Sequence, residues 1–155
     1  MKTLQAGDKA PQFSLLDQNG ETVALTDFAG KKVLVYFYPK AMTPGCTVQA
    51  QGLRDIQSEL EAKNVVVLGI SPDAVKRLPK FIEKESLNFT LLSDEDHAVA
   101  DDFGVWGLKK FMGKEYDGIH RLTFLINEEG TVEHVFNKFK TKDHHIVVLD
   151  YLNNG

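Results

Sequence analysis

The order of strands and helices in the sequence predicts an α/β protein whose central mixed sheet is covered by helices on both faces. Residues 33–38 and 65–70 are two continuous apolar runs of strand length, a pattern typical of strands that are buried on both faces. Between them, residues 44–62 carry apolar side chains at helical spacing, at Leu53, Ile56 and Leu60. A strand, a helix and a second strand in this order predict a right-handed crossover and a parallel pair of strands.

The chain should begin with a β-hairpin. Residues 13–16 and 21–25 have strand character and flank Asn19 and Gly20, a pair that favours a tight turn. A single helical turn over residues 26–30, ended by glycine, should follow this hairpin.

The middle of the chain should continue the alternation of helices and strands. Residues 74–85 have helical character, and Pro79 within them predicts a break or two short helices. Residues 91–92 should form a short strand. Residues 93–96, Ser-Asp-Glu-Asp, resemble a capping box for a helix that ends near Phe103.

The last third should contain a loop, a second hairpin and a final helix. Residues 104–120 include four glycines and are expected to be mostly loop. Residues 122–126 and 131–136 flank a polar turn and should pair as a hairpin. The last helix is expected over residues 142–152.

The composition fits one globular domain spanning residues 1–155. Hydrophobic residues make up 43% and charged residues 26% of the chain, as is ordinary for a soluble protein. The formal charge of −4 and the absence of a basic patch predict no nucleic-acid partner. The N-terminal segment lacks the apolar core of a signal peptide, and no apolar run approaches the roughly 18 residues of a membrane helix. We therefore expect no membrane association, and a lone cysteine favours the reducing cytoplasm.

Cys46 is the only cysteine, and it falls in the first turn of the predicted helix. Thr43 occupies the N-cap position and Pro44 the first helical position, which mark the helix start. Unpaired backbone N–H groups and the helix dipole favour an anion there, so the thiol should ionise readily, and the thiolate is the nucleophile. Small Gly45 should leave room for access, and the Thr43 hydroxyl lies one turn behind the sulfur. The alternative is an inert cysteine buried as a small hydrophobe.

The residues around Cys46 also resemble a known family. Pro39, Thr43 and Cys46 match the Pro-x-x-x-Thr/Ser-x-x-Cys signature of the peroxiredoxins. The longer run Tyr-Phe-Tyr-Pro-Lys-x-x-Thr-Pro-Gly-Cys-Thr is similar to the bacterioferritin comigratory protein branch, also called the Q-type. Similarity continues at Leu-Leu-Ser-Asp, Phe-Gly-Val-Trp-Gly and Gly-Ile-His-Arg and covers nearly the whole chain. The strand and helix order alone also allows a flavodoxin-like arrangement, and the resemblance implies a thioredoxin-like fold.

The resemblance implies a thiol peroxidase for hydrogen peroxide and organic hydroperoxides that needs no bound cofactor. Cys46 would be the nucleophile, and Thr43 would combine capping with donation to the sulfur or the peroxide. Pro39 would shield the sulfur from water. Among three arginines, Arg54 is two helical turns away and Arg77 is expected on a solvated helix face. The resemblance places Arg121 in the site, where its guanidinium would stabilise developing negative charge.

The sequence departs from its relatives in lacking a resolving cysteine. The three positions at which relatives carry a second cysteine are Gln51, the helix around Lys84, and Ala100. A sulfenic acid on Cys46 must then be reduced by an external thiol: thioredoxin, glutaredoxin with glutathione, or another low-molecular-weight thiol. Gly52 should weaken the helix by about 1 kcal/mol and permit some local opening. We expect a monomer or a weak homodimer.

The five histidines predict no metal site. His97 follows three acidic residues, which a solvated, capped helix start explains better than a metal. His144 and His145 are adjacent and point apart on a helix. His120 and Arg121 face opposite ways on a strand, so at most one of them enters the site.

Three questions stay open at the level of sequence. Trp106, Phe111 and Met112 either cover the core, which we favour, or form a contact surface. Two other functions use the same thiol: a non-catalytic redox sensor or partner-binding domain, and a thiol–disulfide oxidoreductase. The absence of a Cys-x-x-Cys motif argues against the latter.

Overall fold

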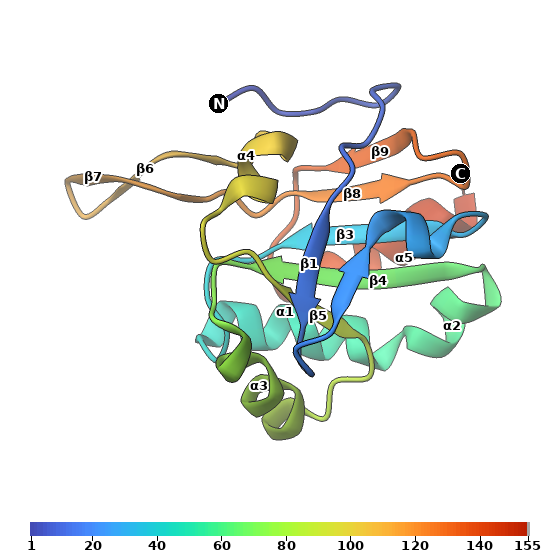
Figure 1. Cartoon of the computed structure of the whole chain (residues 1–155), viewed down its shortest axis with the longest axis horizontal. Coiled ribbons are helices and arrows are strands. Elements are labelled where there is room, and N and C mark those ends of the chain that lie inside the picture. The colour runs from blue at the N-terminus through green and yellow to red at the C-terminus, as the bar shows by residue number, and fades with distance from the viewer. Residues whose placement is uncertain (155) are drawn as a thin grey trace.

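The computed structural model describes residues 1–154 and has a seven-stranded mixed sheet at its centre (Figure 1). Its strands are β1 (Ser14–Asp17), β2 (Thr22–Ala24), β3 (Lys32–Phe37), β4 (Val65–Ser71), β5 (Thr90–Ser93), β8 (Thr123–Ile126) and β9 (Val132–Phe136). The strand order is β2-β1-β5-β4-β3-β8-β9. β3 and β4 are parallel, as predicted, and so are β4 and β5. Both predicted hairpins, β1–β2 and β8–β9, are confirmed.

Helices cover both faces of this sheet. They are α1 (Pro44–Asp55), α2 (Gln57–Ala62), α3 (Leu78–Glu85), α4 (Ala98–Phe103) and α5 (His144–Asn154), with 3-10 turns η1 (Leu25–Phe28) and η2 (Val75–Arg77). Side chains alternate along β3, so that Leu34 and Tyr36 join a core cluster under α1, α2, α3 and α5. Val35 and Phe37 join a second cluster on the opposite face, under α4 and η1.

Two helices differ in detail from the prediction. The helix expected over residues 44–62 is divided at Ile56, whose backbone leaves helical geometry (φ −109°, ψ 13°). The expected break near Pro79 separates η2 from α3, and Pro79 lies in the first turn of α3. A missing N–H leaves no helical bond unmade there, so proline is tolerated.

The predicted start of α4 is wrong. No capping box forms at residues 93–96, and the helix begins only at Ala98. The Asp94 carboxylate instead accepts hydrogen bonds from the N–H groups of Val99 (3.2 Å) and Ala100 (2.9 Å). The Asp94 carboxylate therefore binds the free N–H groups of the first helical turn from a position several residues before the helix.

The region predicted as loop is a second, two-stranded sheet. β6 (Trp106–Phe111) and β7 (Lys114–Ile119) pair antiparallel and project from the body of the protein (Figure 1). Phe111 and Met112 at its tip are 65% and 87% exposed, so the expectation that they cover the core is wrong. Only Trp106 packs against the core, and its indole stacks on His97 with ring centroids 3.8 Å apart. Among residues 1–154, none of the helices combines the length and apolar character needed to cross a membrane.

Candidate active site

The chemically active part of the sequence lies at the carboxyl ends of the parallel strands. Pro39 follows the end of β3 and begins a loop that leads through Thr43 into α1. Ser71 and Ser93 end the neighbouring strands β4 and β5. Carboxyl ends of parallel strands meet at one edge of a sheet, and open α/β sheets commonly carry their sites there.

Cys46 lies in the first turn of α1, as predicted, and its thiol is free. The residue is only 1% exposed and belongs to the cluster that also contains Tyr36, Tyr38 and Ala41. The expected access through Gly45 is not seen, because the guanidinium of Arg121 occupies that space. Cys46 is therefore enclosed in the described conformation, with aromatic side chains and the Pro39–Thr43 loop around it.

The Arg121 side chain reaches the first turn of α1 and lies against Gly45. A Cβ added at Gly45 would lie 3.1 Å from Arg121 Nη2. The Arg121 Nη1 group donates to Gln49 Oε1 at 3.1 Å. The strand expected over residues 122–126 is β8, which starts at Thr123, two residues after Arg121. Arg121 thus precedes β8 and lies against the start of α1.

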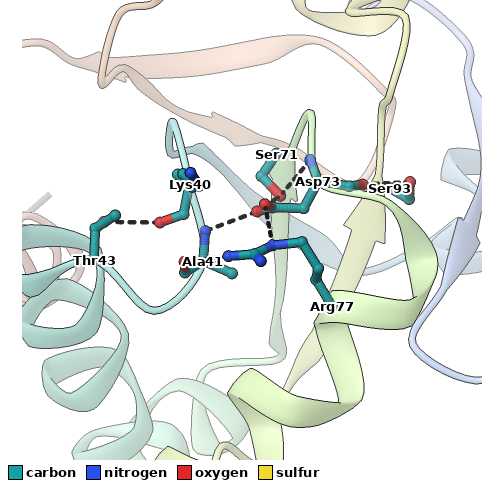
Figure 2. A network of polar contacts seen from close by, with 7 residues as sticks. All are labelled: Lys40, Ala41, Thr43, Ser71, Asp73, Arg77 and Ser93. Atoms are coloured by element: carbon teal, nitrogen blue, oxygen red, sulfur yellow. Dashed lines mark hydrogen bonds and ion pairs between the residues drawn. The ribbon is translucent and has the colours of Figure 1, made fainter.

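Thr43 is the N-cap residue of α1, as predicted, but its side chain does not cap the helix. The Thr43 hydroxyl makes no hydrogen bond to the backbone of α1. It donates instead to the carbonyl oxygen of Lys40 at 2.8 Å (Figure 2). This bond ties the two ends of the loop together and fixes the rotamer of a hydroxyl three residues before the thiol.

Two tyrosines form the wall of the site that faces the sheet. The rings of Tyr36 and Tyr38 stack with centroids 5.4 Å apart, and both residues are fully buried. Burial raises the pKa of both phenols, and the negative charge that Cys46 can carry acts in the same direction. Both phenols therefore remain neutral O–H groups beside the thiol.

His144 lies behind Tyr36 and is also neutral. The imidazole is buried, its Nε2 lies 2.9 Å from Thr123 Oγ1, and its ring centroid is 6.0 Å from that of Tyr36. Burial, followed by the charge of neighbouring His145, lowers the pKa of His144 to about 3. The predicted divergence of the two histidines is confirmed, because His145 packs instead against Gly52 of α1.

The roles of three polar side chains that bind Arg121, the β6–β7 hairpin or the Pro39–Thr43 loop were not predicted from the sequence. Gln49 is fully buried and positions Arg121. The sequence feature that could have indicated this role is a glutamine on the apolar face of the helix, one turn after Cys46.

The second residue is Lys109 of β6, which donates to the Ile119 carbonyl oxygen at 2.7 Å. Desolvation lowers the pKa of Lys109, the positive charge of Arg121 lowers it further, and Cys46 acts in the opposite direction.

The third is Arg77, which was wrongly expected on a solvated helix face. Its Nε donates to Asp73 Oδ1 at 3.0 Å and its Nη2 donates to the Ala41 carbonyl oxygen at 3.2 Å. Ala41 lies in the loop between Pro39 and Thr43. Asp73, four residues earlier in the chain, was the available signal for this ion pair.

The position of the absent resolving cysteine is occupied by a hydrogen-bonded side chain. Gln51 Nε2 donates to Glu85 Oε1 at 2.8 Å, and Arg54 Nη1 donates to the Glu85 carbonyl oxygen at 2.7 Å. These bonds join α1 to the end of α3.

Across the described chain, no three His, Cys, Asp or Glu side chains gather as metal ligands.

Comparisons with known proteins agree with this geometry. A family model described as AhpC/TSA family matches residues 6–135. A putative peroxiredoxin bcp of Haemophilus influenzae is 66% identical over 152 residues, which cover 98% of this chain and 98% of that protein. Peroxiredoxin Bcp of Escherichia coli is also 66% identical over 152 residues, covering 98% and 97%.

Solved structures support the same assignment. A cysteine-to-serine mutant of Xanthomonas campestris peroxiredoxin Q matches with a TM-score of 0.89 and 34% identity, over 97% of this chain and 98% of that chain. The predicted thioredoxin-like fold is thereby confirmed. The chain belongs to the AhpC/TSA family, as a thiol-dependent peroxidase of the bacterioferritin comigratory protein branch whose one cysteine is Cys46.

Proposed function

We propose that Cys46 is the peroxidatic residue and that it reduces hydrogen peroxide and small organic hydroperoxides. The observation that carries this proposal is the approach of the Arg121 guanidinium to the helix turn that holds the only thiol of the chain. The helix N-terminus and a permanent cation both lie where the reacting sulfur carries negative charge. Attack on a peroxide also builds negative charge on the departing oxygen, which the same guanidinium can stabilise.

The first step transfers one oxygen from the peroxide to sulfur. The Cys46 thiolate attacks one peroxide oxygen, an S–O bond forms and the O–O bond breaks. The departing oxygen takes a proton and leaves as water or an alcohol, and Cys46 becomes a sulfenic acid. Thr43 is proposed to orient the peroxide, because its hydroxyl oxygen retains lone pairs while its proton is bound by Lys40 O. Pro39 is proposed to shield the sulfur from water.

The second step uses an external thiol. An incoming thiol attacks the sulfenic sulfur, water leaves, and a mixed disulfide forms; a second thiol then releases the Cys46 thiolate. Position 51 is glutamine and Cys46 is the only cysteine, so this chain cannot resolve the sulfenic acid with a second thiol of its own. The 1% exposure of Cys46 implies that a bulky reductant must wait for the loop or α1 to open. We propose thioredoxin, or glutaredoxin with glutathione, as the reductant.

Peroxide turnover with defined reductants tests the proposal. Wild-type protein and Cys46→Ser are compared with hydrogen peroxide and an alkyl hydroperoxide, using the thioredoxin and glutaredoxin systems side by side. Turnover by wild type and none by Cys46→Ser is the expected result. Oxidation of Cys46 without turnover in any thiol system would instead favour a redox sensor.

Two broader properties accompany this function. We propose that the protein works in the cytoplasm, because a single free thiol fits a reducing compartment. We also propose that it is a monomer or a weak homodimer, which light scattering across a concentration series would test.

A further inference from the structure

The loop that joins β3 to α1 holds a backbone conformation that its sequence does not favour. Met42 has φ +68°, in the left-handed region, although it is neither glycine nor asparagine. A methionine in this conformation is strained and persists only where its surroundings enforce it. Met42 immediately precedes Thr43, so its conformation sets the direction from which Thr43 enters the site.

Two residues from the next crossover hold the loop on one side of Met42. Asp73 Oδ2 accepts a hydrogen bond from the Ala41 N–H at 2.7 Å. Arg77 Nη2 donates to the Ala41 carbonyl oxygen at 3.2 Å, and Arg77 Nε donates to Asp73 Oδ1 at 3.0 Å (Figure 2). Both backbone polar groups of one buried residue are therefore bound by a single ion pair. On the other side of Met42, the Thr43 hydroxyl is bound by Lys40 O.

The ion pair is itself fixed to the ends of two strands. The Asp73 side chain is 5% exposed and also accepts from Ser71 Oγ at 2.8 Å. Ser93 Oγ donates to the Asp73 carbonyl oxygen at 2.6 Å. A buried carboxylate with this many partners cannot shift without leaving one of them unsatisfied. These hydrogen bonds thus fix the position of the Pro39–Thr43 loop relative to the carboxyl ends of β4 and β5.

We propose that Asp73 and Arg77 are positioning residues for peroxide reduction. Acting through Ala41, they hold Met42 in its left-handed conformation and thereby set Thr43 and Pro39 relative to the Cys46 sulfur. Neither side chain needs to touch the peroxide. The inference rests on the proposed roles of Cys46 and Thr43, and it adds two residues that the active-site signature does not contain.

Two rates on the same thiol separate positioning from general damage. Oxidation of Cys46 by hydrogen peroxide requires the ordered loop, whereas alkylation by iodoacetamide requires only that the enclosed thiol become exposed, which a loosened loop does not hinder. Both are measured in single turnover at one pH, with thermal melts to confirm folding. Arg77→Ala should lower the peroxide rate about 10-fold or more without lowering the alkylation rate. Asp73→Asn should act in the same way, because an amide cannot serve Ala41 N–H and Arg77 together.

Arg54→Ala is the matched control. The Arg54 guanidinium also donates Nε to an aspartate, Asp55, and another N–H to a backbone carbonyl, that of Glu85, but it joins α1 to α3. Its ratio of peroxide rate to alkylation rate should equal that of wild type. Arg77→Lys, whose ammonium serves fewer acceptors in a fixed geometry, should give an intermediate ratio.

A rescue variant tests the stated mechanism directly. Glycine adopts φ +68° at little cost, so adding Met42→Gly to Arg77→Ala should restore part of the lost peroxide rate. A wild-type peroxide rate in Arg77→Ala, or an equal loss of peroxide rate in Arg54→Ala, would overturn the inference. If wild-type Cys46 is alkylated but does not react with peroxide, the proposed function itself fails.

Discussion

The Arg121 guanidinium lies across the first turn of α1 in the space that a glycine leaves open. Its Nη2 atom is 3.1 Å from the point at which a Cβ on Gly45 would stand. This is tighter than most contacts of real Cβ atoms, so a side chain at position 45 would push the guanidinium aside by a few tenths of an ångström. Gly45 therefore matters for the position of the cation rather than for an open path to the thiol.

Gly45→Ala should slow the reaction of Cys46 with peroxide by up to about 10-fold, because the guanidinium must shift by only a few tenths of an ångström from its position over the helix turn. Stopped-flow or competition kinetics with hydrogen peroxide measure the effect. In an Arg121→Lys background the same substitution should cause little further loss, because the rigid fork that it displaces is already gone. Independent, multiplicative losses in the double variant would show that Gly45 acts in another way.

Gly52 should tolerate alanine poorly even though alanine is the better helix former. A Cβ at this position would overlap the His145 ring, with 2.8 Å to its Cγ atom. Gly52→Ala should lower the free energy of unfolding by about 1–3 kcal/mol, the usual cost of overpacking.

Urea denaturation of a double-mutant cycle checks this explanation. In a His145→Ala background, Gly52→Ala should become stabilising by up to about 1 kcal/mol, because only helix propensity remains. A destabilisation of the same size in both backgrounds would mean that the α1–α5 contact is not its cause. The sequence-based view of Gly52 as a weak point for local opening gives way to one of close helix packing.

Stability should fall as the pH drops from about 6.5 toward 3 because of His144. Burial lowers the pKa of its imidazole to about 3 in the folded protein, against about 6.5 when unfolded. Within this window the unfolded chain binds one proton more than the folded chain, so acid favours unfolding by up to about 1.4 kcal/mol per pH unit. Above pH 6.5 neither state protonates this group, and the dependence vanishes.

Urea titrations between pH 7.5 and 5 measure this slope while most carboxylates remain ionised. His144→Gln can keep a polar contact with Thr123 and cannot titrate, so its slope over this range should be shallower than that of wild type. Equal slopes in the two proteins would assign the pH dependence to other groups.

Gln51→Cys should convert external resolution into an internal disulfide. In a helix, residues five apart are separated by about 7.5 Å along the axis and by about 140° around it, too far for a disulfide. α1 must unwind for the two sulfurs to meet, and this substitution also removes the Gln51–Glu85 hydrogen bond that holds α1 to α3. After one equivalent of peroxide, intact mass should show a loss of about 2 Da, as Cys46 and the introduced cysteine form a disulfide.

Wild-type protein is the control for that experiment and should gain one oxygen instead. If the Gln51→Cys protein also accumulates only oxygen adducts, α1 does not open on the time scale of oxidation. The one-cysteine mechanism would still hold for the natural sequence.

The elements that depend on short stretches of chain were predictable. Thr43 and Pro44 mark the start of α1, and apolar runs mark β3 and β4, because capping, proline geometry and burial patterns act over a few residues. The β6–β7 hairpin escaped prediction for a local reason. Met112 and Gly113 both have positive φ, as a type I′ turn requires, and methionine is not a residue that signals such a turn.

The site shows the same division. The sequence alone determined which atom can be the nucleophile, because the chain has one thiol and local signals place it at a helix start. Only the tertiary structure decided what surrounds that thiol. Arg121, Gln49 and Arg77 find their partners across strand neighbours and crossovers, 72 residues apart for Arg121–Gln49 and 36 for Arg77–Ala41. Such pairings follow from sheet order and register, which no local pattern of residues encodes.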